Sequence, residues 1–449
     1  MSMTINIWIY LLHHQFQHYF LERKLLFVKR AAILLCLLFT STIINADPVK
    51  QLINKSLLTH PLILSSQSEV TASQADVESA LWQYYPSPAV QVTTADATSS
   101  RTLTLNKPTT ILSIEQPLWT GGRLTGGVDK AAANLNDSQE GLQQTRRDIA
   151  LRVIQAYGDW YAANLRIQAW EESLATHFRL KGSVTRRFEE GVAANSDKKL
   201  AESRLESVIA DLASTRAEEH VALSSLSQLA GEQIIRENIL SLPSIPVLET
   251  NLDTMLQQAM TLSPAVQQAL AQTDQVQADV SIQKSEYWPD VFLRLEHQFG
   301  NRQSTDSSSD SRISIGLRST FGAGLSTFSA SRSIQAKYQA SLSQVDAQRR
   351  NINEQVQSDY YLANSFKARL SALKSASATT EEVFNSYNRQ YLAGRKTWFD
   401  LLNSARDLVQ AKIQLADAES ANLVVMWRIA ILTQELDLLI ENVQSGNNG

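Results

Sequence analysis

The chain has 449 residues, of which 43% are hydrophobic and 19% are charged, and its formal net charge is −4. This composition excludes a disordered tail, and the acidic balance lacks the basic footprint of a nucleic-acid-binding protein. Only 16 glycines and 10 prolines occur, and so few helix breakers favour long helices.

The first 46 residues contain a short apolar segment that is typical of a secretory signal. It runs from Ala31 to Ile44, follows Lys29 and Arg30, and ends just before Asn45-Ala46. A spanning helix needs about 20 apolar residues, so we expect an N-terminal extension and signal peptide over residues 1–46, with a signal anchor as the alternative. The only cysteine, Cys36, lies in this segment, which leaves the remaining chain without disulfides or thiol chemistry.

The rest of the chain is an internal duplication. Landmarks of one half recur 203 positions later: Pro61 and Pro264, Pro86 and Pro289, Arg146 and Arg349, Gly191 and Gly394, and Asp197 and Asp400. We therefore expect a first repeat over residues 47–230 and a second over 251–440. The proline-containing segment 231–250 is expected to link them, and 441–449 to form a C-terminal tail.

Each repeat is predicted to read helix, strand, strand, long helix, turn, helix. The strands are expected at about 87–97, 109–119, 290–300 and 311–320. Apolar and polar residues alternate in these segments with a period of two, which predicts strands with one apolar face. Their length, about ten residues, is what a tilted membrane-spanning strand needs.

Aromatic residues gather at the ends of the predicted strands. They are Trp82, Tyr84, Tyr85 and Trp119 in the first repeat, and Tyr287, Trp288 and Phe321 in the second. Such residues form a girdle at the membrane interface of β-barrels. Ordinary packing at strand–helix junctions is the other interpretation.

A heptad pattern follows the strands in both repeats. Apolar positions spaced four and three apart run from Ile149 to Leu174, and the pattern recurs from Ile352 to Ser377. This spacing predicts helices that pack along a sustained seam. No proline occurs between Arg123 and Glu190, and an uninterrupted helix there would be roughly 100 Å long.

Four amphipathic strands cannot stand alone in a lipid bilayer. An open sheet leaves unpaired N–H and C=O groups at its edges, and small barrels need about eight strands. Several copies must therefore join. Three copies would supply twelve strands around a lumen.

Several local motifs add a family resemblance. They are Tyr85-Pro86, Trp288-Pro289, the segment Gln116-Pro117-Leu118-Trp119-Thr120-Gly121-Gly122, and the segment from Tyr391 to Asp400. Together with the duplication, they make residues 47–440 resemble the TolC family of outer-membrane efflux proteins. The resemblance implies a mainly α-helical fold with a membrane β part. It also implies a homotrimer whose twelve-stranded barrel sits in the lipid of the outer membrane and continues as an α-helical barrel across the periplasm.

The same resemblance implies partners and excludes catalysis. Such channels dock to a periplasmic adaptor and an inner-membrane transporter, and they are not enzymes. No cofactor is expected. His60, His177, His220 and His297 stand isolated, without the spacing of metal ligands.

The helix ends farthest from the strands are the predicted gate. Gly191 and Gly394 each end a long helix, as a left-handed capping glycine does. The resemblance implies that these tips close the tunnel, with Asp400 and Asn403 at the pore constriction and polar ties among Ser196, Asp197, Tyr391 and Lys396. Thr397-x-x-Asp400 also fits a capping box, so Asp400 has two candidate roles, which can coexist.

The transported cargo has two candidate classes. The segment from Trp82 to Pro88 resembles the subgroup that exports large adhesins by type I secretion, powered by an ABC transporter. The alternative is small-molecule or drug efflux with a proton-driven pump. A different class of protein, a periplasmic coiled-coil adaptor or rod, also has long helical hairpins but lacks the duplicated strands.

Overall fold

The computed structural model describes residues 47–93, 109–249, 251–299, 310–320 and 326–441. The chain divides into two units, Met1–Asp47 and Pro48–Gly449, and all described helices and strands belong to the second. The predicted signal peptide lies outside the described residues, as does the predicted tail beyond residue 441. No helix in the described ranges has an apolar stretch long enough to cross a bilayer.

The second unit contains the predicted strands, long helices and final helices twice, but two helices rather than the predicted one precede each pair of strands. The first set is α2 (Pro48–Thr59), α3 (Pro61–Trp82), β1 (Ser87–Thr93), β2 (Thr109–Trp119), α4 (Arg123–Glu189) and α5 (Asn195–Ala230). The second set is α6 (Leu252–Leu262), α7 (Pro264–Ser285), β3 (Asp290–Phe299), β4 (Asp310–Arg318), α8 (Thr327–Leu392) and α9 (Trp398–Thr433). The 3-10 turn η1 (Arg236–Asn238) lies between the sets, and α10 (Leu436–Glu441) follows them.

Matching sequence signals begin the corresponding helices. α3 and α7 each start with a proline, whose missing N–H costs nothing in the first turn. The side chains of His60 and Ser263 cap them by accepting hydrogen bonds from the N–H groups of Leu62 and Val266. The duplication is therefore visible at the level of helix caps.

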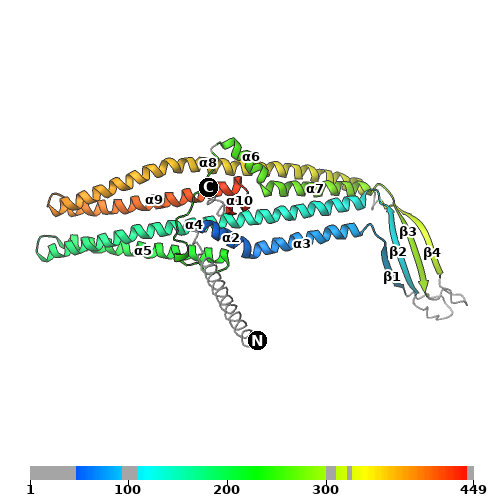
Figure 1. Ribbon diagram of the computed structural model, residues 1–449, viewed down its shortest axis with the longest axis horizontal. Helices are drawn as coiled ribbons and strands as arrows, with labels where there is room; N and C mark the ends of the chain where they lie inside the picture. Colours follow the sequence, from blue (N-terminus) through cyan, green and yellow to red (C-terminus); the bar gives the residue numbers. More distant parts are fainter. Residues whose placement is uncertain (1–46, 94–108, 250, 300–309, 321–325, 442–449) are drawn as a thin grey trace, which may run out of the picture. The chain divides into compact units, whose positions relative to one another are not determined.

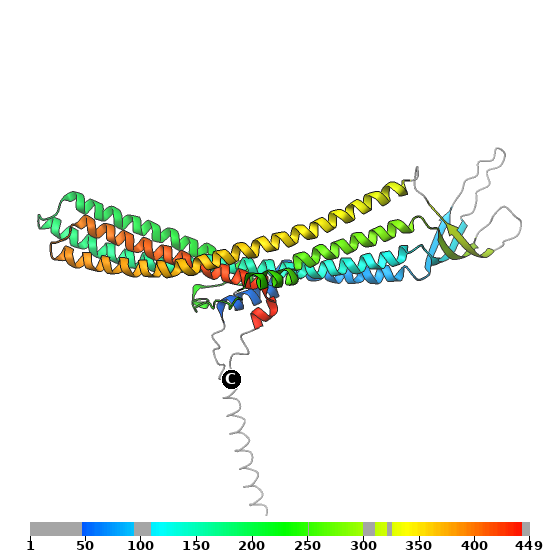
Figure 2. The same ribbon diagram turned by 90° about the horizontal axis from the view of Figure 1, so that it is seen from above.

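The strands and the helices that adjoin them follow one order. The four strands form a single antiparallel sheet in the order β1-β2-β3-β4. The helices contact one another in the same order, α3-α4-α7-α8 (Figures 1 and 2). Toward the hairpin turns, α5 packs on α4, α4 on α9, and α9 on α8. Among the described strands, β1 and β4 are therefore the edges of the sheet, and α3 and α8 lie at the two ends of the helix row that adjoins it.

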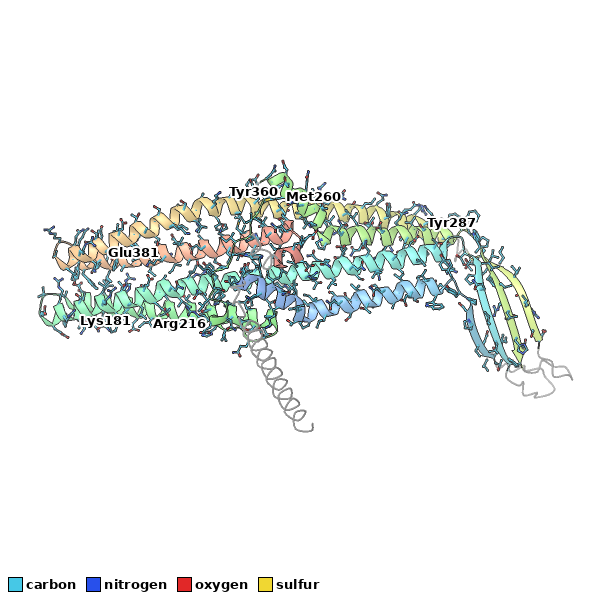
Figure 3. The ribbon with its side chains drawn as sticks, in the orientation of Figure 1. Lys181, Arg216, Met260, Tyr287, Tyr360 and Glu381 are labelled. Atoms are coloured by element: carbon cyan, nitrogen blue, oxygen red, sulfur yellow. The ribbon has the colours of Figure 1, made fainter. Side chains whose placement is uncertain are left out.

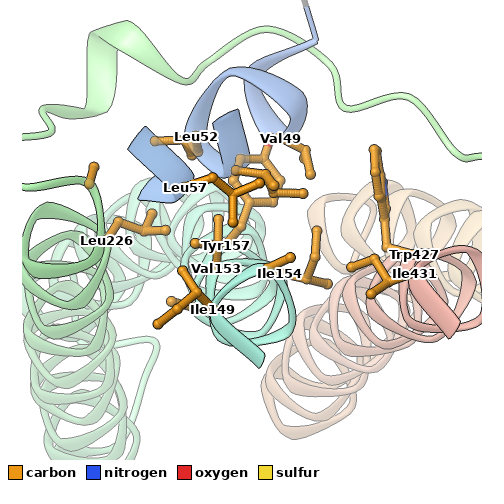
Figure 4. Close-up of a cluster of buried hydrophobic side chains, with 14 of the residues drawn as sticks. Val49, Leu52, Leu57, Ile149, Val153, Ile154, Tyr157, Leu226, Trp427 and Ile431 are labelled. Atoms are coloured by element: carbon orange, nitrogen blue, oxygen red, sulfur yellow. The ribbon is translucent and has the colours of Figure 1, made fainter. Parts of the chain in front are cut away.

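The largest core surrounds the middle of α4. Side chains of α4 between Ile149 and Trp160 pack against α2, α5, α9 and the linker (Figure 4). Trp427 of α9 is fully buried there, and its indole N–H donates to the Ser244 carbonyl over 2.9 Å. Because the indole proton is satisfied by the linker backbone, this bond fixes the linker to α9.

The predicted heptad seams are the buried faces of the long helices. Ile149, Val153, Trp160 and Ile167 of α4 are all at most 1% exposed. In α8, Val356 is fully buried and Ile352, Ala363 and Phe366 are partly buried against the same cluster. The seam also buries a charge, because Asp359 is 1% exposed and is held by the Arg428 guanidinium.

Candidate functional site

One face of the sheet is apolar and open to solvent in a single chain. Cross-strand pairs such as Ile114 with Leu295 and Leu295 with Ile313 place apolar side chains in rows. Ile313 is 73% exposed. An apolar face of this extent is typical of a surface that contacts lipid.

The opposite face carries a network of charges. Arg294 lies 2.9 Å from Glu296 and 3.9 Å from Glu115, and Arg318 reaches the same Glu115 carboxylate at 3.5 Å. Arg318 also stacks on the Phe292 ring, 4.6 Å from its centroid. Partly exposed ion pairs of this kind suit an aqueous lumen rather than hydrocarbon.

Aromatic side chains gather where the helices meet the strands. Trp119 and Trp288 meet edge to face with their ring centroids 6.0 Å apart, and both remain largely exposed. Trp82 and Tyr85 form a second exposed pair at 5.1 Å. Tyr287 lies at the same junction (Figure 3). Their exposure favours an interfacial girdle over core packing; Phe321 lies outside the described residues.

The far ends of the helices form two similar hairpin turns. Gly191 and Gly394 both have φ of +73°, which a residue with a Cβ rarely adopts. In each turn the glycine N–H bonds to the third carbonyl back, and the next residue's N–H to the fifth. This double bonding is the Schellman arrangement, which satisfies the last carbonyls of a helix.

Asp400 lies in the capping box that the sequence predicts as one of its roles. The Thr397 hydroxyl accepts from the Asp400 N–H at 3.2 Å, and the Asp400 carboxylate accepts from the Thr397 N–H at 3.3 Å. Hydrogen bonds from the Thr397 hydroxyl and amide lower the pKa of the Asp400 carboxyl. The cap therefore stabilises this turn while Asp400 is ionised, and this stabilisation is lost as pH falls through the lowered pKa.

Asn403 follows Asp400 by three residues on α9, so the two side chains lie on one side of the helix. Both are partly exposed. A constriction would require equivalent residues from other copies. The geometry within one chain is compatible with that role and with capping.

The predicted ties are not formed within a single chain. Lys396 lies over the Tyr387 ring, 4.3 Å from its centroid, and Tyr391 is buried against Trp398. Among the described residues, no ion pair or side-chain hydrogen bond joins Asp197 or Ser196 to Tyr391 or Lys396. Asp197 occupies the first turn of α5, where a carboxylate interacts favourably with the helix dipole.

The two tips are instead joined by a contact that sequence reasoning missed. The Arg187 guanidinium of α4 lies over the Tyr391 ring of α8, 5.1 Å from its centroid. Both residues belong to ordinary helical stretches, and only the packing of α4 against α8 shows that they meet. Leu180 and Val184 of α4 pack into the same buried cluster as Leu401 of α9.

Metal ligation finds no support in the described ranges, where no group of three or more His, Cys, Asp or Glu side chains is placed to hold an ion. His60 serves as a helix cap. His177 is buried and bonds to Ser173, and burial lowers the pKa of its imidazole. These histidines therefore have structural partners.

Comparison with known proteins gives a consistent picture. A family model described as "Outer membrane efflux protein" matches residues 52–232 and 255–424. The cobalt-zinc-cadmium resistance protein CzcC of Cupriavidus metallidurans is 24% identical over 320 residues, covering 66% of this chain and 70% of its own. The alkaline protease secretion protein AprF of Pseudomonas aeruginosa is 22% identical over 359 residues, covering 75% and 72%.

A solved structure has the same fold. The crystal structure of CusC superposes with a TM-score of 0.75 and 16% sequence identity, over 86% of this chain and 92% of that one. At this identity the likeness establishes the fold alone.

Proposed function

This chain belongs to the outer membrane efflux protein family, and from that premise and the open edges of its sheet we propose that three copies assemble into one export channel. The resemblance to the TolC family inferred from the sequence is thereby confirmed. Members of this family are outer-membrane conduits rather than enzymes, and they extend into the periplasm.

The two unpaired edges carry the proposal of a closed assembly of several copies, and the resemblance to the TolC family sets the number of copies at three. β1 and β4 each have a free row of N–H and C=O groups among the described strands, and lipid cannot satisfy them. Four strands are too few to close, since small barrels need about eight. Pairing β4 of each copy with β1 of the next gives an antiparallel barrel of twelve strands, and the edge helices α3 and α8 become neighbours in the same way.

The two faces of the sheet set its orientation in this assembly. The apolar face that contains Ile114 and Leu295 would face lipid. The face with Glu115, Arg294 and Arg318 would line the lumen. The exposed tryptophans at the helix–strand junctions would then lie at the periplasmic membrane interface.

Disulfide scanning between copies tests this assembly. With Cys36 replaced by serine, Gln91→Cys in β1 is combined in turn with cysteines at Arg312, Ile313, Ser314 and Ile315 of β4. Gln91 and Arg312 lie on the polar face, and successive side chains of a strand point to opposite faces. We therefore expect Gln91→Cys to form cross-links with a cysteine that replaces Arg312 or Ser314. We expect none with a cysteine that replaces Ile313 or Ile315. The products should stop at a trimer. Monomers at every position, or ladders beyond three copies, would contradict the proposal.

We assign the cargo to type I secretion of a large protein such as an adhesin, through a periplasmic adaptor and an inner-membrane ABC transporter. The similarity to AprF, which bears the name of a protease secretion protein, supports this assignment. The similarity to CzcC, a resistance protein, favours the alternative of small-solute efflux with a proton-driven pump.

The tips are proposed to close the periplasmic end of the channel. Asp400 and Asn403 from three copies would form the constriction, with one charged and one neutral ring, and hence a weak preference for cations. Three Asp400 carboxylates in a narrow pore would repel one another and raise their pKa, opposing the effect of Thr397. The ties of Ser196 and Asp197 to Tyr391 and Lys396 would form when the copies assemble.

Removing a tie should make the assembled channel leakier. We expect Asp197→Ala and Lys396→Ala each to raise single-channel conductance in a planar bilayer, because a hydrogen bond to a charged group is worth about 1.5–3 kcal/mol. Lys367→Ala, an exposed lysine of α8 far from the tip, is the control. Conductance equal to that of the control would count against these ties.

A further inference from the structure

Corresponding helices of the two repeats begin with caps of different chemistry. His60 caps α3, and its Nδ1 atom accepts a hydrogen bond from the Leu62 N–H over 3.2 Å. The corresponding residue, 203 positions later, is Ser263. Its hydroxyl oxygen caps α7 by accepting from the Val266 N–H over 3.4 Å. An imidazole in the first repeat therefore does what a hydroxyl does in the second.

The same difference recurs within the long helices. His177 of α4 is 5% exposed, and its Nδ1–H donates to the Ser173 carbonyl, four residues back, over 3.0 Å. The corresponding residue of α8 is Thr380, whose hydroxyl donates to the Ala376 carbonyl, also four residues back, over 2.7 Å. Both repeats thus make the same bond along the long helix. Only the first makes it with a group that can take up a proton near neutral pH.

Protonation removes the cap at His60. A neutral imidazole has one nitrogen that accepts a hydrogen bond, whereas both nitrogens of an imidazolium are donors. Protonated His60 therefore cannot accept from the Leu62 N–H, and its charge would lie at the end of α3 where the helix dipole is already positive. Burial and the nearby cation of Arg152 in α4 lower the pKa of the His60 imidazole.

Protonation of His177 places a charge in the packed interior. Since a carbonyl can only accept, Nδ1 already carries its proton, and a further proton must go to Nε2. Burial lowers the pKa of this imidazole most, the hydrogen bond to Ser173 partly offsets that effect, and the Arg204 guanidinium of α5 lowers the pKa further. The charged groups that act on the two histidines are thus both cations, Arg152 and Arg204.

Both histidines stabilise the folded helices only while they are neutral. An imidazole whose pKa is lowered in the folded chain binds its proton more readily when the helix is open. The stabilisation is therefore complete above the ordinary imidazole pKa of about 6.5, and it is lost as the pH falls through the lowered values. The hydroxyls of Ser263 and Thr380 take up no proton in this range.

We propose that the first repeat contains an acid-sensitive switch that the second repeat lacks. Protonation of His60 and His177 loosens the start of α3 and the adjoining part of α4. The hydroxyls of Ser263 and Thr380 leave α7 and α8 unchanged. The switch lies within each chain and goes beyond the proposed channel, so it does not require the copies to assemble. In a channel built from such chains, acid would loosen one half of every copy and leave the other half rigid.

Hydrogen–deuterium exchange of the purified protein in detergent tests the switch, because it reports the local opening of helices. Exchange is measured at about pH 7.5 and about pH 5.5, on either side of the ordinary imidazole pKa of about 6.5, and is corrected for the pH dependence of the chemical step. The unmodified chain is compared with His60→Ser and His177→Thr, which place the residues of the second repeat in the first.

In the unmodified chain, we expect exchange over residues 61–66 to rise about fivefold in acid, the typical effect of losing a helix cap. Exchange over residues 173–184 should rise as well, because the open helix solvates the charged imidazole. His60→Ser should abolish only the first rise, and His177→Thr only the second. The matching segments of the second repeat, residues 264–269 and 376–387, should exchange equally at both pH values.

His220→Gln is the matched control, because it removes an exposed histidine of α5 and should leave both rises in place. Exchange in the unmodified chain that is the same at both pH values would overturn the inference, whatever the variants do. Equal rises in both repeats, or a rise over residues 61–66 that persists in His60→Ser, would overturn it too. Failure of the chains to form a trimer would instead count against the proposed function, and exchange within each chain could still be measured.

Discussion

The variant Ile114→Arg should fail to accumulate as an assembled protein in the outer membrane. Ile114 lies in the centre of the apolar face and pairs with Leu295 across the sheet. An arginine on the lipid face near the bilayer midplane costs about 2–4 kcal/mol, and three copies would bear this cost together, for about 6–12 kcal/mol. The measurement is the fraction of chains that migrate as heat-modifiable trimer from outer-membrane fractions.

The neighbouring residue provides the control for this prediction. Ser113 points to the opposite face and pairs with Glu296, so Ser113→Arg places the same charge in the polar network beside a carboxylate. We expect near-normal amounts of trimer for this variant. Equal loss for both substitutions would mean that the two faces do not differ in their surroundings, and the assigned orientation would be wrong.

The variant Arg428→Met should cause the largest loss of helix stability. It leaves the Asp359 carboxylate, which is 1% exposed, without its bidentate guanidinium partner between α8 and α9. Removing one partner of a buried ion pair typically costs about 3–5 kcal/mol, because the remaining charge has no water to solvate it. Thermal loss of the helical circular dichroism signal, measured on the purified protein in detergent, would show the change.

Two further variants separate this cost from the loss of packing. Arg428→Met combined with Asp359→Leu removes both charges and should recover most of the stability, since an apolar pair of similar size often replaces a buried ion pair without loss. Arg349→Met breaks an exposed pair with Asp346 within α8 and should cost at most about 1 kcal/mol. A midpoint for Arg428→Met equal to that of Arg349→Met would contradict the prediction.

Periodicity was sufficient to predict the helices and strands because its signals are local. The alternation in residues 290–300 and the heptads after Ile149 depend on residues within one segment, and the structure contains β3 and α4 where they predict them. Gly191 and Gly394 were recognisable for the same reason, since a glycine between two helical patterns has few other roles. Because the landmarks of the two repeats are separated by a constant offset, an element predicted in one repeat also predicted its counterpart in the other.

The contacts between segments could not be predicted in this way. Nothing in the sequence indicates that β2 pairs with β3 across the boundary of the repeats, or that Asp359 in an apolar seam faces Arg428. At the tips, the resemblance implied that Lys396 ties to Asp197, whereas in one chain Lys396 lies over Tyr387. The proposed contact between Lys396 and Asp197 depends on neighbouring copies. The positions of those copies cannot be inferred from the local sequence pattern of one chain.

The open edges at β1 and β4 also bear on biogenesis. If the sheet is completed only by other copies, a lone chain has no stable state within the bilayer, so membrane insertion has to coincide with association. The yield of channel should then rise more steeply than linearly with the amount of chain synthesised. A copy whose β1 edge cannot pair would trap its two companions in an unclosed ring, and such a variant would act dominantly over the normal protein in the same cell.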